Sequence, residues 1–267
     1  MNALDQLRAK KGFLCDMDGV IYHGNCLLPG AVSFVNWMQA QEKRFLFFTN
    51  NSERSPRELQ QKLDRLGLIV DETHFYTSAL ATAAFVSSQI PGCSAYVIGE
   101  HGLINALYDA GVTMNDINPD YVIIGETRNY NFDSMKKADS LVRAGAKLIG
   151  TNYDLTGPTE AGIAPACRAL VAPIELTTGK QAYYVGKPNP LMLRTGLRLL
   201  GVDNEDAAII GDRMDTDIVA GIESEIDTVL VLSGVSTEQT MRDFAYRPKY
   251  ILQGVHSIPP ALGGDIP

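Results

Sequence analysis

The stretch FLCDMDGV, residues 13–20, joins a run of apolar residues to two carboxylates and a glycine. The apolar run predicts a buried strand, and in a parallel α/β sheet ligands bind beyond the carboxyl ends of the strands. Asp16 and Asp18 stand at positions i and i+2, so their side chains point the same way at that edge. Two carboxylates this close repel each other, and a cation or a shared proton is expected between them. By itself the pattern is equally compatible with a calcium loop or a simple turn.

Short apolar runs of this kind recur along the chain and alternate with longer amphipathic segments. Strands are expected at Gly12–Cys15, Arg44–Thr49, Ala95–Gly99, Tyr121–Ile124, Lys147–Gly150, Tyr183–Val185, Ala207–Ile210 and Thr228–Leu232. Helices are expected at Pro56–Leu66, Ser78–Gln89, Gly102–Ala110, Phe132–Ala144, Pro190–Leu200 and Asp215–Ile222. The alternation of continuous apolar strands with helices predicts an α/β protein with mainly parallel sheets.

Two further strand ends carry polar residues that are suited to binding an anion. The stretch FLFFTNNS, residues 45–52, includes Thr49 and Asn50, which can donate to an oxyanion together with nearby backbone N–H groups. The stretch VGKP, residues 185–188, places Lys187 after a short apolar run, where its ammonium group can act as a point charge for phosphate. A capped loop and a solvated lysine are the simpler interpretations of these two stretches taken singly.

The stretch AIIGDRMDTD, residues 208–217, is a fourth apolar run that ends in carboxylates. Oxygen ligands suit Mg²⁺, which binds through one or two carboxylates and keeps water and substrate oxygens as its other ligands. Acidic residues also favour the N-terminus of a helix, and Asp215 fits that simpler interpretation. Asp212 and Asp217 are therefore the functional candidates.

The composition limits the classes of protein to which the chain can belong. Its 267 residues allow one large domain or two modest ones. A formal net charge of −8, from 23 basic and 31 acidic residues, argues against a nucleic-acid polymer as partner. The apolar runs are too short for a membrane span, no secretory signal core follows Met1 and no CxxC pair occurs, so a cytoplasmic protein with reduced thiols is expected. A homo-oligomer is compatible with this composition.

Taken together, the four stretches resemble the motifs of the haloacid dehalogenase superfamily of phosphotransferases, in order and over nearly the whole chain. The first motif is matched by Asp16 and Asp18, the second by Thr49, the third by Lys187 and the fourth by Asp212 with Asp217. Within the superfamily the chain is most similar to the NagD-like phosphatases (type IIA), whose large α/β cap is inserted between motifs two and three. The similarity includes segments 75–79, 118–122, 125–128, 151–152, 165–167 and 232–236.

The resemblance implies a domain organisation. A Rossmann-like parallel-sheet core is expected at residues 1–79 and 179–267. A second α/β domain, the cap, is expected as an insertion at residues 80–178. This agrees with the position of the catalytic pattern, which lies on both sides of the middle third of the chain.

The resemblance also implies a reaction. Asp16 is expected to attack phosphorus and form an aspartyl-phosphate, and Asp18 to act as general acid and then as general base. Mg²⁺ is the expected cofactor, bound by Asp16, Asp212 and the backbone carbonyl of Asp18. The chain is therefore expected to be a Mg²⁺-dependent phosphomonoesterase.

The remaining motif residues are expected around the phosphate. Thr49, Asn50 and Lys187 would hold its equatorial oxygens. Asp217 is expected to lie behind the residues that contact the metal and the phosphate, where it would orient Lys187 or a water on the metal.

The cap is expected to choose the substrate, which would be a small phosphorylated metabolite. Candidate specificity residues are Asn152, Tyr153 and Asp154, together with segment 125–128, although a structural connection inside the cap is the simpler interpretation. The resemblance favours nucleoside monophosphates of the UMP and GMP type, with broad specificity; sugar phosphates or other small phosphometabolites are the alternative. A dinucleotide-dependent oxidoreductase is disfavoured because no GxGxxG motif follows the first strand. A catalytically inert binding protein on the same fold is the remaining alternative.

Overall fold

A computed structural model describes residues 2–159 and 162–260 of the chain. The described residues form two compact units, of which the first lies within residues 1–48, 66–68 and 196–267 and the second within residues 49–65 and 69–195. Each unit has a parallel sheet of its own, which confirms the predicted α/β class with a Rossmann-like core and an inserted second domain. The predicted boundaries at 79/80 and 178/179 separate a catalytic core from a substrate-selecting cap. Because they are defined by these functions, they stay a prediction.

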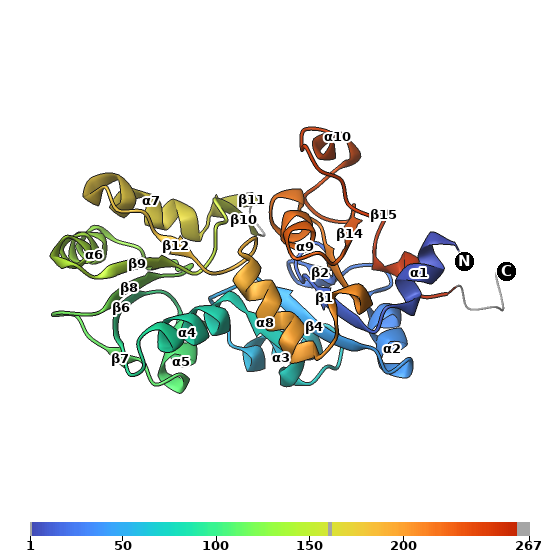
Figure 1. The fold of residues 1–267 in the computed structure, drawn as a ribbon, viewed down its shortest axis with the longest axis horizontal. Coiled ribbons are helices and arrows are strands. Elements are labelled where there is room, and N and C mark those ends of the chain that lie inside the picture. Colours follow the sequence, from blue (N-terminus) through green and yellow to red (C-terminus); the bar gives the residue numbers. More distant parts are fainter. Residues whose placement is uncertain (1, 160–161, 261–267) are drawn as a thin grey trace. The chain divides into compact units, whose positions relative to one another are not determined.

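The sheet of the first unit contains strands that all run in the same direction (Figure 1). Their spatial order is β15 (Tyr250–Leu252), β14 (Asp227–Val231), β13 (Ala207–Gly211), β1 (Gly12–Cys15) and β4 (Arg44–Thr49). In this register Cys15 is opposite Ile210 of β13 and Phe47 of β4. The carboxyl ends of these strands therefore meet at one edge, where ligands bind in such sheets.

Short helices and one hairpin complete the first unit. They are α1 (Ala3–Ala9), the β2–β3 hairpin (Tyr22–His23 and Cys26–Leu27), α2 (Ala31–Ala40), η2 (Asn204–Asp206), η3 (Met214–Ile218), α9 (Val219–Glu223), α10 (Glu238–Met241) and η4 (Val255–Ser257). The chain begins with a capping box, in which the Asn2 side chain accepts from the backbone of Asp5 and the Asp5 side chain accepts in return. Every residue of β1 is buried, as a central strand covered on both faces requires.

The second unit contains another parallel sheet, with the order β12 (Tyr183–Tyr184), β9 (Lys147–Gly150), β8 (Tyr121–Ile124), β6 (Ser94–Ile98) and β7 (Thr113–Met114). Its other elements are α3 (Pro56–Arg65), η1 (Glu72–His74), β5 (Phe75–Thr77), α4 (Ser78–Gln89), α5 (His101–Asp109), α6 (Phe132–Ala144), the β10–β11 hairpin (Thr156–Thr159 and Gly162–Pro165) and α7 (Cys167–Thr178). Figure 1 shows α6 and α7 over one face of this sheet and α4 and α5 over the other. The chain then passes through α8 (Pro190–Leu200) into the first unit.

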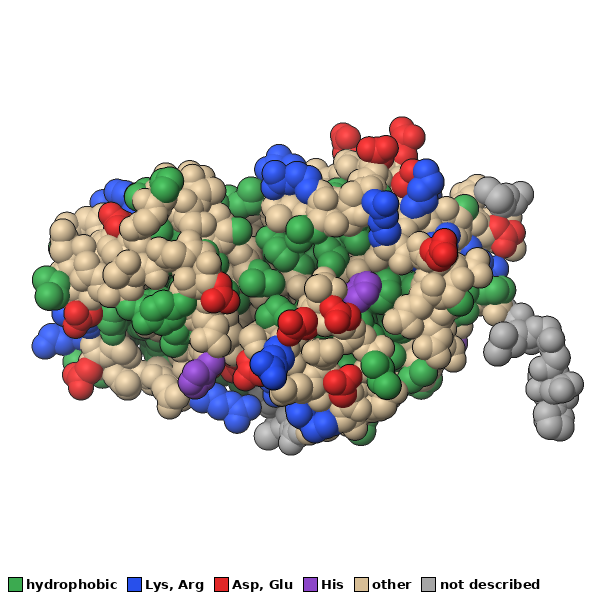
Figure 2. Space-filling model, turned by 90° about the horizontal axis from the view of Figure 1, so that it is seen from below, with side chains coloured by type: hydrophobic (Ala, Val, Ile, Leu, Met, Phe, Trp, Pro, Cys, Tyr) green, Lys and Arg blue, Asp and Glu red, His purple; other side chains and the backbone are tan. Residues whose placement is uncertain are grey.

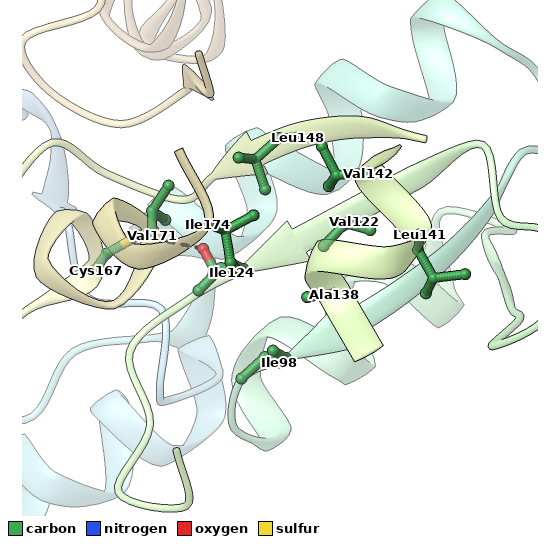
Figure 3. Packing of buried hydrophobic residues seen from close by; sticks show 10 residues of the cluster. All are labelled: Ile98, Val122, Ile124, Ala138, Leu141, Val142, Leu148, Cys167, Val171 and Ile174. Carbon is green, nitrogen blue, oxygen red and sulfur yellow. Dashed lines mark hydrogen bonds between the residues drawn. The ribbon is translucent and has the colours of Figure 1, made fainter. Parts of the chain in front are cut away.

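The core of the second unit lies between its sheet and the pair α6 and α7. Figure 3 shows the ten buried residues of this cluster, which come from β6, β8, β9 and the two helices. Val122 and Ile124 of β8 are fully buried at its centre, and the Cys167 thiol at the start of α7 donates to the Ile124 carbonyl at 3.2 Å. This packing fixes the start of α7 against the carboxyl end of β8.

Most predicted elements lie where the sequence indicated, and their ends either agree with the prediction or differ from it by one residue. The strand expected at Thr228–Leu232 is Asp227–Val231, for example. The helix expected at Asp215–Ile222 is wrong as a single regular helix, because a wide π-type turn at Met214–Ile218 precedes α9. Such turns are rare in helices and common at functional sites.

The surface agrees with the acidic composition. On the face shown in Figure 2, Lys and Arg side chains lie singly or in small groups among acidic ones, and do not form one broad basic surface. Among the helices of residues 2–159 and 162–260, none is both long enough and apolar enough to cross a membrane.

Candidate active site

Three carboxylates meet at the carboxyl edge of the first unit's sheet. Asp16 directly follows β1, and Asp212 and Asp217 follow β13, its parallel neighbour. One oxygen from each carboxylate lies within 4.8 Å of the others. Asp212 is 2% exposed and Asp217 is fully buried. The predicted convergence of these acids at one edge is therefore what the fold produces.

Asp212 is held by backbone that packs directly against its carboxylate. The Val235 N–H donates to Oδ2 of Asp212 at 2.7 Å. A Cβ atom at Gly19 would lie 2.4 Å from that oxygen, and one at Gly234 would lie 2.0 Å from it. Glycine is therefore required at both positions, and at Gly19 the positive φ of 78° requires it independently.

Asp217 is fixed in a similar way from its own turn. Its Oδ2 accepts from the Arg213 N–H at 3.2 Å, and a Cβ at Gly211 would lie 2.1 Å from its Cγ. Asp215 differs, because its side chain is exposed and forms an ion pair with Arg213 at 2.9 Å. Asp217 thus lies with the buried acids, and Asp215 lies at the surface.

Asp18 has different surroundings from the other acids of the first unit. Its Oδ1 lies 3.5 Å from His23 Nδ1 in the β2–β3 hairpin, and both side chains are partly exposed. The sequence does not indicate that His23 lies beside Asp18, because their proximity depends on the hairpin. The ligand role predicted for Asp18 uses its backbone carbonyl, so it does not require the side chain to join the carboxylate cluster.

The cluster of Asp16, Asp212 and Asp217 fits a divalent cation. Two buried carboxylates and a third beside them repel one another at these distances unless positive charge or protons offset the repulsion. All of the side-chain donors are oxygens, which are the ligands of Mg²⁺ and Ca²⁺ in proteins. The residues present therefore match the chemistry of a hard metal ion.

In the second unit, the side chain of Asn50 forms hydrogen bonds with the backbone of Lys187. Its Oδ1 accepts from the Lys187 N–H at 2.8 Å, and its Nδ2 donates to the Lys187 carbonyl at 3.0 Å. The other hydrogen of Nδ2 is donated to Oδ2 of Asp154 at 2.9 Å. Lys187 is only 2% exposed. The amide of Asn50 thus fixes the position of the Lys187 backbone and braces it against Asp154. The sequence did not indicate this role.

The residues around this brace are packed closely. A Cβ at Gly186 would lie 2.6 Å from Oδ1 of Asn50 and 2.7 Å from the Thr151 carbonyl, so glycine is needed next to the lysine. Thr49 is 7% exposed, and its hydroxyl accepts from the backbone N–H of Asn51 at 3.1 Å.

The candidate specificity residues form one connected loop after β9. Asn152 is buried, and its Nδ2 donates both to the Asn50 carbonyl, at 2.8 Å, and to the Glu126 carboxylate, at 2.7 Å. Burial of the Glu126 carboxyl raises its pKa to about 7. Segment 125–128 was a candidate for substrate selection, with a structural connection as the simpler alternative; the hydrogen bonds of Glu126 to Ser52 and Asn152 depend on the fold.

The ring of Tyr153 contacts Arg168, a residue that the sequence did not mark as a candidate. The guanidinium of Arg168, on α7, lies 3.9 Å from the centre of the Tyr153 ring, and Tyr184 meets that ring edge-on at 5.0 Å. Arg168 lies fifteen positions later in the chain, and its contact depends on the β10–β11 hairpin returning α7 to this loop. One face of Tyr153 is thus covered by a cation.

Comparison with known proteins gives concordant results. The profile of the family described as haloacid dehalogenase-like hydrolase matches residues 13–113, and a second, described as HAD-hydrolase-like, matches residues 184–258. The chain is 42% identical to the ribonucleotide monophosphatase NagD of Escherichia coli K12, over 93% of this chain and 98% of that one. It is also 42% identical to a dihydroxyacetone phosphatase of Corynebacterium glutamicum (91% and 88% covered) and 36% identical to an acid sugar phosphatase of Staphylococcus saprophyticus (93% and 96% covered). The solved structure of E. coli NagD superposes with a TM-score of 0.88 at 41% identity, covering 94% of this chain and 99% of that one.

Proposed function

The chain belongs to the haloacid dehalogenase-like hydrolases, in their NagD branch, and is a phosphatase; from this we propose that it is a Mg²⁺-dependent phosphomonoesterase that acts on nucleoside monophosphates of the UMP and GMP type with broad specificity. The observation that carries the Mg²⁺-dependent reaction is the group of three carboxylates within 4.8 Å at the ends of β1 and β13. The nucleotide substrate is proposed from the similarity to the ribonucleotide monophosphatase NagD. Among hard metal ions, Mg²⁺ is the one usually held by one or two carboxylates while it also contacts substrate phosphate.

The reaction is assigned to the acids of the first unit. Asp16 attacks phosphorus, the bond to the leaving oxygen breaks, and an aspartyl-phosphate forms. Asp18 gives its proton to the leaving alkoxide and then takes a proton from the water that releases phosphate and regenerates Asp16. Bound Mg²⁺ supplies positive charge against the repulsion between Asp16 and the phosphate. It would be held by Asp16, Asp212 and the backbone carbonyl of Asp18, with Asp217 beside it.

The phosphate oxygens are assigned to the second unit. Lys187 supplies a positive charge for the phosphate. Because the lysine is almost fully buried, little water screens its attraction to the phosphate oxygens. Thr49 contributes its hydroxyl. Asn50 holds Lys187 in place through its side chain, as its three hydrogen bonds indicate, and contributes to the phosphate site by doing so.

Residues 80–178 are proposed to act as the cap, with Asn152, Tyr153 and Asp154 selecting the leaving group. The substrate is then a small phosphorylated metabolite rather than a polymer. A cytoplasmic location stays a prediction from the sequence.

A sugar-phosphate or other small phosphometabolite substrate is the second candidate, and one observation favours it. The guanidinium of Arg168 covers a face of Tyr153, so a nucleobase can stack on that face only by displacing the cation. A guanidinium at this position instead offers several N–H donors to hydroxyl, carboxylate or carbonyl oxygens of a smaller leaving group. The names of the dihydroxyacetone and acid sugar phosphatases among the relatives are consistent with this alternative.

The test is phosphate release from a panel of nucleoside monophosphates, sugar phosphates and p-nitrophenyl phosphate. Each substrate is assayed with Mg²⁺, with EDTA and with Asp16→Asn. Turnover that needs Mg²⁺ and disappears in the variant supports the proposed reaction, and the ranking of kcat/KM decides between the two substrate classes. Absence of turnover on every substrate, in folded protein with Mg²⁺ present, would favour an inert binding role.

A further inference from the structure

We propose that Glu126 is a positioning residue of the phosphatase reaction: its carboxylate fixes Ser52 and Asn152, and through them the Asn50–Lys187 pair. The inference rests on the proposed function, since Lys187 is expected to hold the phosphate. It goes beyond that function because it assigns to Glu126 control over how well the lysine is placed. Glu126 itself need not touch substrate.

The carboxylate of Glu126 is surrounded by hydrogen-bond donors. Its Oε2 accepts from both the backbone N–H, at 3.1 Å, and the hydroxyl of Ser52, and its Oε1 accepts from Asn152 Nδ2 at 2.7 Å. The Ser52 hydroxyl is oriented for this by the Glu126 N–H at 3.0 Å and by the Thr151 hydroxyl at 3.2 Å, both of which donate to it. An ionised carboxylate only accepts hydrogen bonds, so three converging donors match that state. The loops that carry these donors follow β4 and β9.

A chain of hydrogen bonds through Asn152 and Asn50 connects this carboxylate to the backbone of Lys187. The Nδ2 group of Asn152 that donates to Glu126 also donates to the Asn50 carbonyl at 2.8 Å, where the Ser78 hydroxyl donates as well, at 2.6 Å. The side chain of Asn50 then binds the Lys187 N–H and carbonyl at 2.8 and 3.0 Å. A small rotation of Asn152 would therefore be passed to the lysine, and displacements of about 1 Å at a reacting group can cost about a hundredfold in rate.

The charge of Glu126 is sensitive to pH in the neutral range. Burial raises its pKa to about 7, against hydrogen bonds from Ser52 and Asn152 that lower it. The other groups that face it are the Asp154 carboxylate, after β9, which raises the pKa further, and the Cys167 thiol at the start of α7. Burial raises the pKa of that thiol to about 12, so it stays neutral. Protonation of Glu126 would add a hydrogen to a carboxyl group that is surrounded by hydrogen-bond donors. It would therefore weaken the hydrogen bonds from Asn152 and Ser52.

The experiment compares the wild type with Glu126→Gln, in which the side chain cannot ionise. KM and kcat for p-nitrophenyl phosphate, and the Kd for inorganic phosphate by calorimetry with Mg²⁺ present, are measured across the neutral range. Wild-type kcat/KM should fall as the pH falls through about 7, mostly through a higher KM, whereas the variant should lack this limb. At high pH the variant should be about tenfold or more below the wild type, as expected when a charged hydrogen-bond acceptor is lost, and the two should converge at low pH. Ionisation of substrate affects both proteins equally and cancels in their ratio.

Glu100→Gln is the matched control. Glu100 is another hydrogen-bonded glutamate of the same unit, and it accepts from the Thr127 hydroxyl at 2.6 Å and from the Arg128 N–H at 3.3 Å. Its pH profile and phosphate affinity should coincide with those of the wild type. Ser52→Ala supplies a second variant if Glu126→Gln does not fold, because loss of a hydrogen bond that lowers the pKa of Glu126 should move the limb to higher pH.

The outcomes separate this inference from the proposed function. An active wild type whose pH limb persists in Glu126→Gln, with unchanged phosphate affinity, overturns the positioning role and leaves the phosphatase assignment intact. A wild type that neither turns over p-nitrophenyl phosphate nor binds phosphate overturns both. A limb that is lost in Glu126→Gln, kept in Glu100→Gln and displaced upward in Ser52→Ala establishes the role.

Discussion

Replacing Glu126 by Gln should change how the free energy of unfolding depends on pH. The pKa of this carboxyl rises from its ordinary 4.5 to about 7 in the folded protein because the group is buried, so the folded state binds the proton more tightly than the unfolded chain. The stabilisation from this proton is fully present below the unfolded pKa and is lost as the pH rises through the folded pKa. At about 1.36 kcal/mol per pKa unit, the stability of the wild type relative to Glu126→Gln should fall by roughly 2–3 kcal/mol from about pH 5 to about pH 8.

The assay is urea unfolding followed by far-UV circular dichroism, in EDTA, at a series of pH values. Only the difference between wild type and variant is interpreted, because every other titrating group is common to both proteins. A wild-type minus Glu126→Gln difference that is constant across this range, or that grows as the pH rises, would refute the account of a buried, proton-binding carboxyl.

Three further substitutions follow from the contacts of the site. Gly234→Ala should push Asp212 aside and lower kcat/KM by about a hundredfold or more while the fold persists; an unchanged kcat/KM and Mg²⁺ affinity would show that the Asp212 position is not critical. Asn50→Ala removes three hydrogen bonds and should lower the free energy of unfolding by roughly 2–4 kcal/mol and weaken phosphate binding through Lys187; calorimetry that shows wild-type phosphate affinity would contradict the bracing role. Arg168→Ala should leave p-nitrophenyl phosphate turnover within about twofold but change the ratio of kcat/KM between sugar phosphates and nucleotides by about tenfold; an unaltered ratio would remove Arg168 from substrate selection.

Sequence reasoning predicted that the acids of the first unit meet because their contacts follow from strand topology. Asp16 and Asp212 each stand directly after an apolar strand, and parallel strands bring their carboxyl ends to one edge. Once two such strands are neighbours, the acids that follow them meet. The Gly19 and Gly234 requirements were not reached, since they depend on how closely two loops approach one carboxylate.

The supporting residues of the second unit could not be predicted in the same way. Glu126 contacts Ser52 across 74 positions in the sequence, and Asn152 contacts the Asn50 carbonyl across 102. No local pattern marks such pairs, because serine, asparagine and glutamate are common in surface loops. The stack of Arg168 on Tyr153 was missed for the same reason. Helix and strand periodicity locates elements, but it does not specify which loops exchange hydrogen bonds.

The central claim is that Asp16 becomes phosphorylated during turnover, and the most direct measurement is to capture that species. Asp18→Asn is mixed with p-nitrophenyl phosphate and Mg²⁺, since this leaving group departs without an acid whereas release of phosphate from the enzyme needs the base. The reaction is quenched with acid, and peptides are examined by mass spectrometry. We expect a phosphoryl group on the peptide that contains Asp16, absent in EDTA and absent when Asp16→Asn is added to the same protein. Release of p-nitrophenol with no phosphoryl group on Asp16 at any quench time would contradict it.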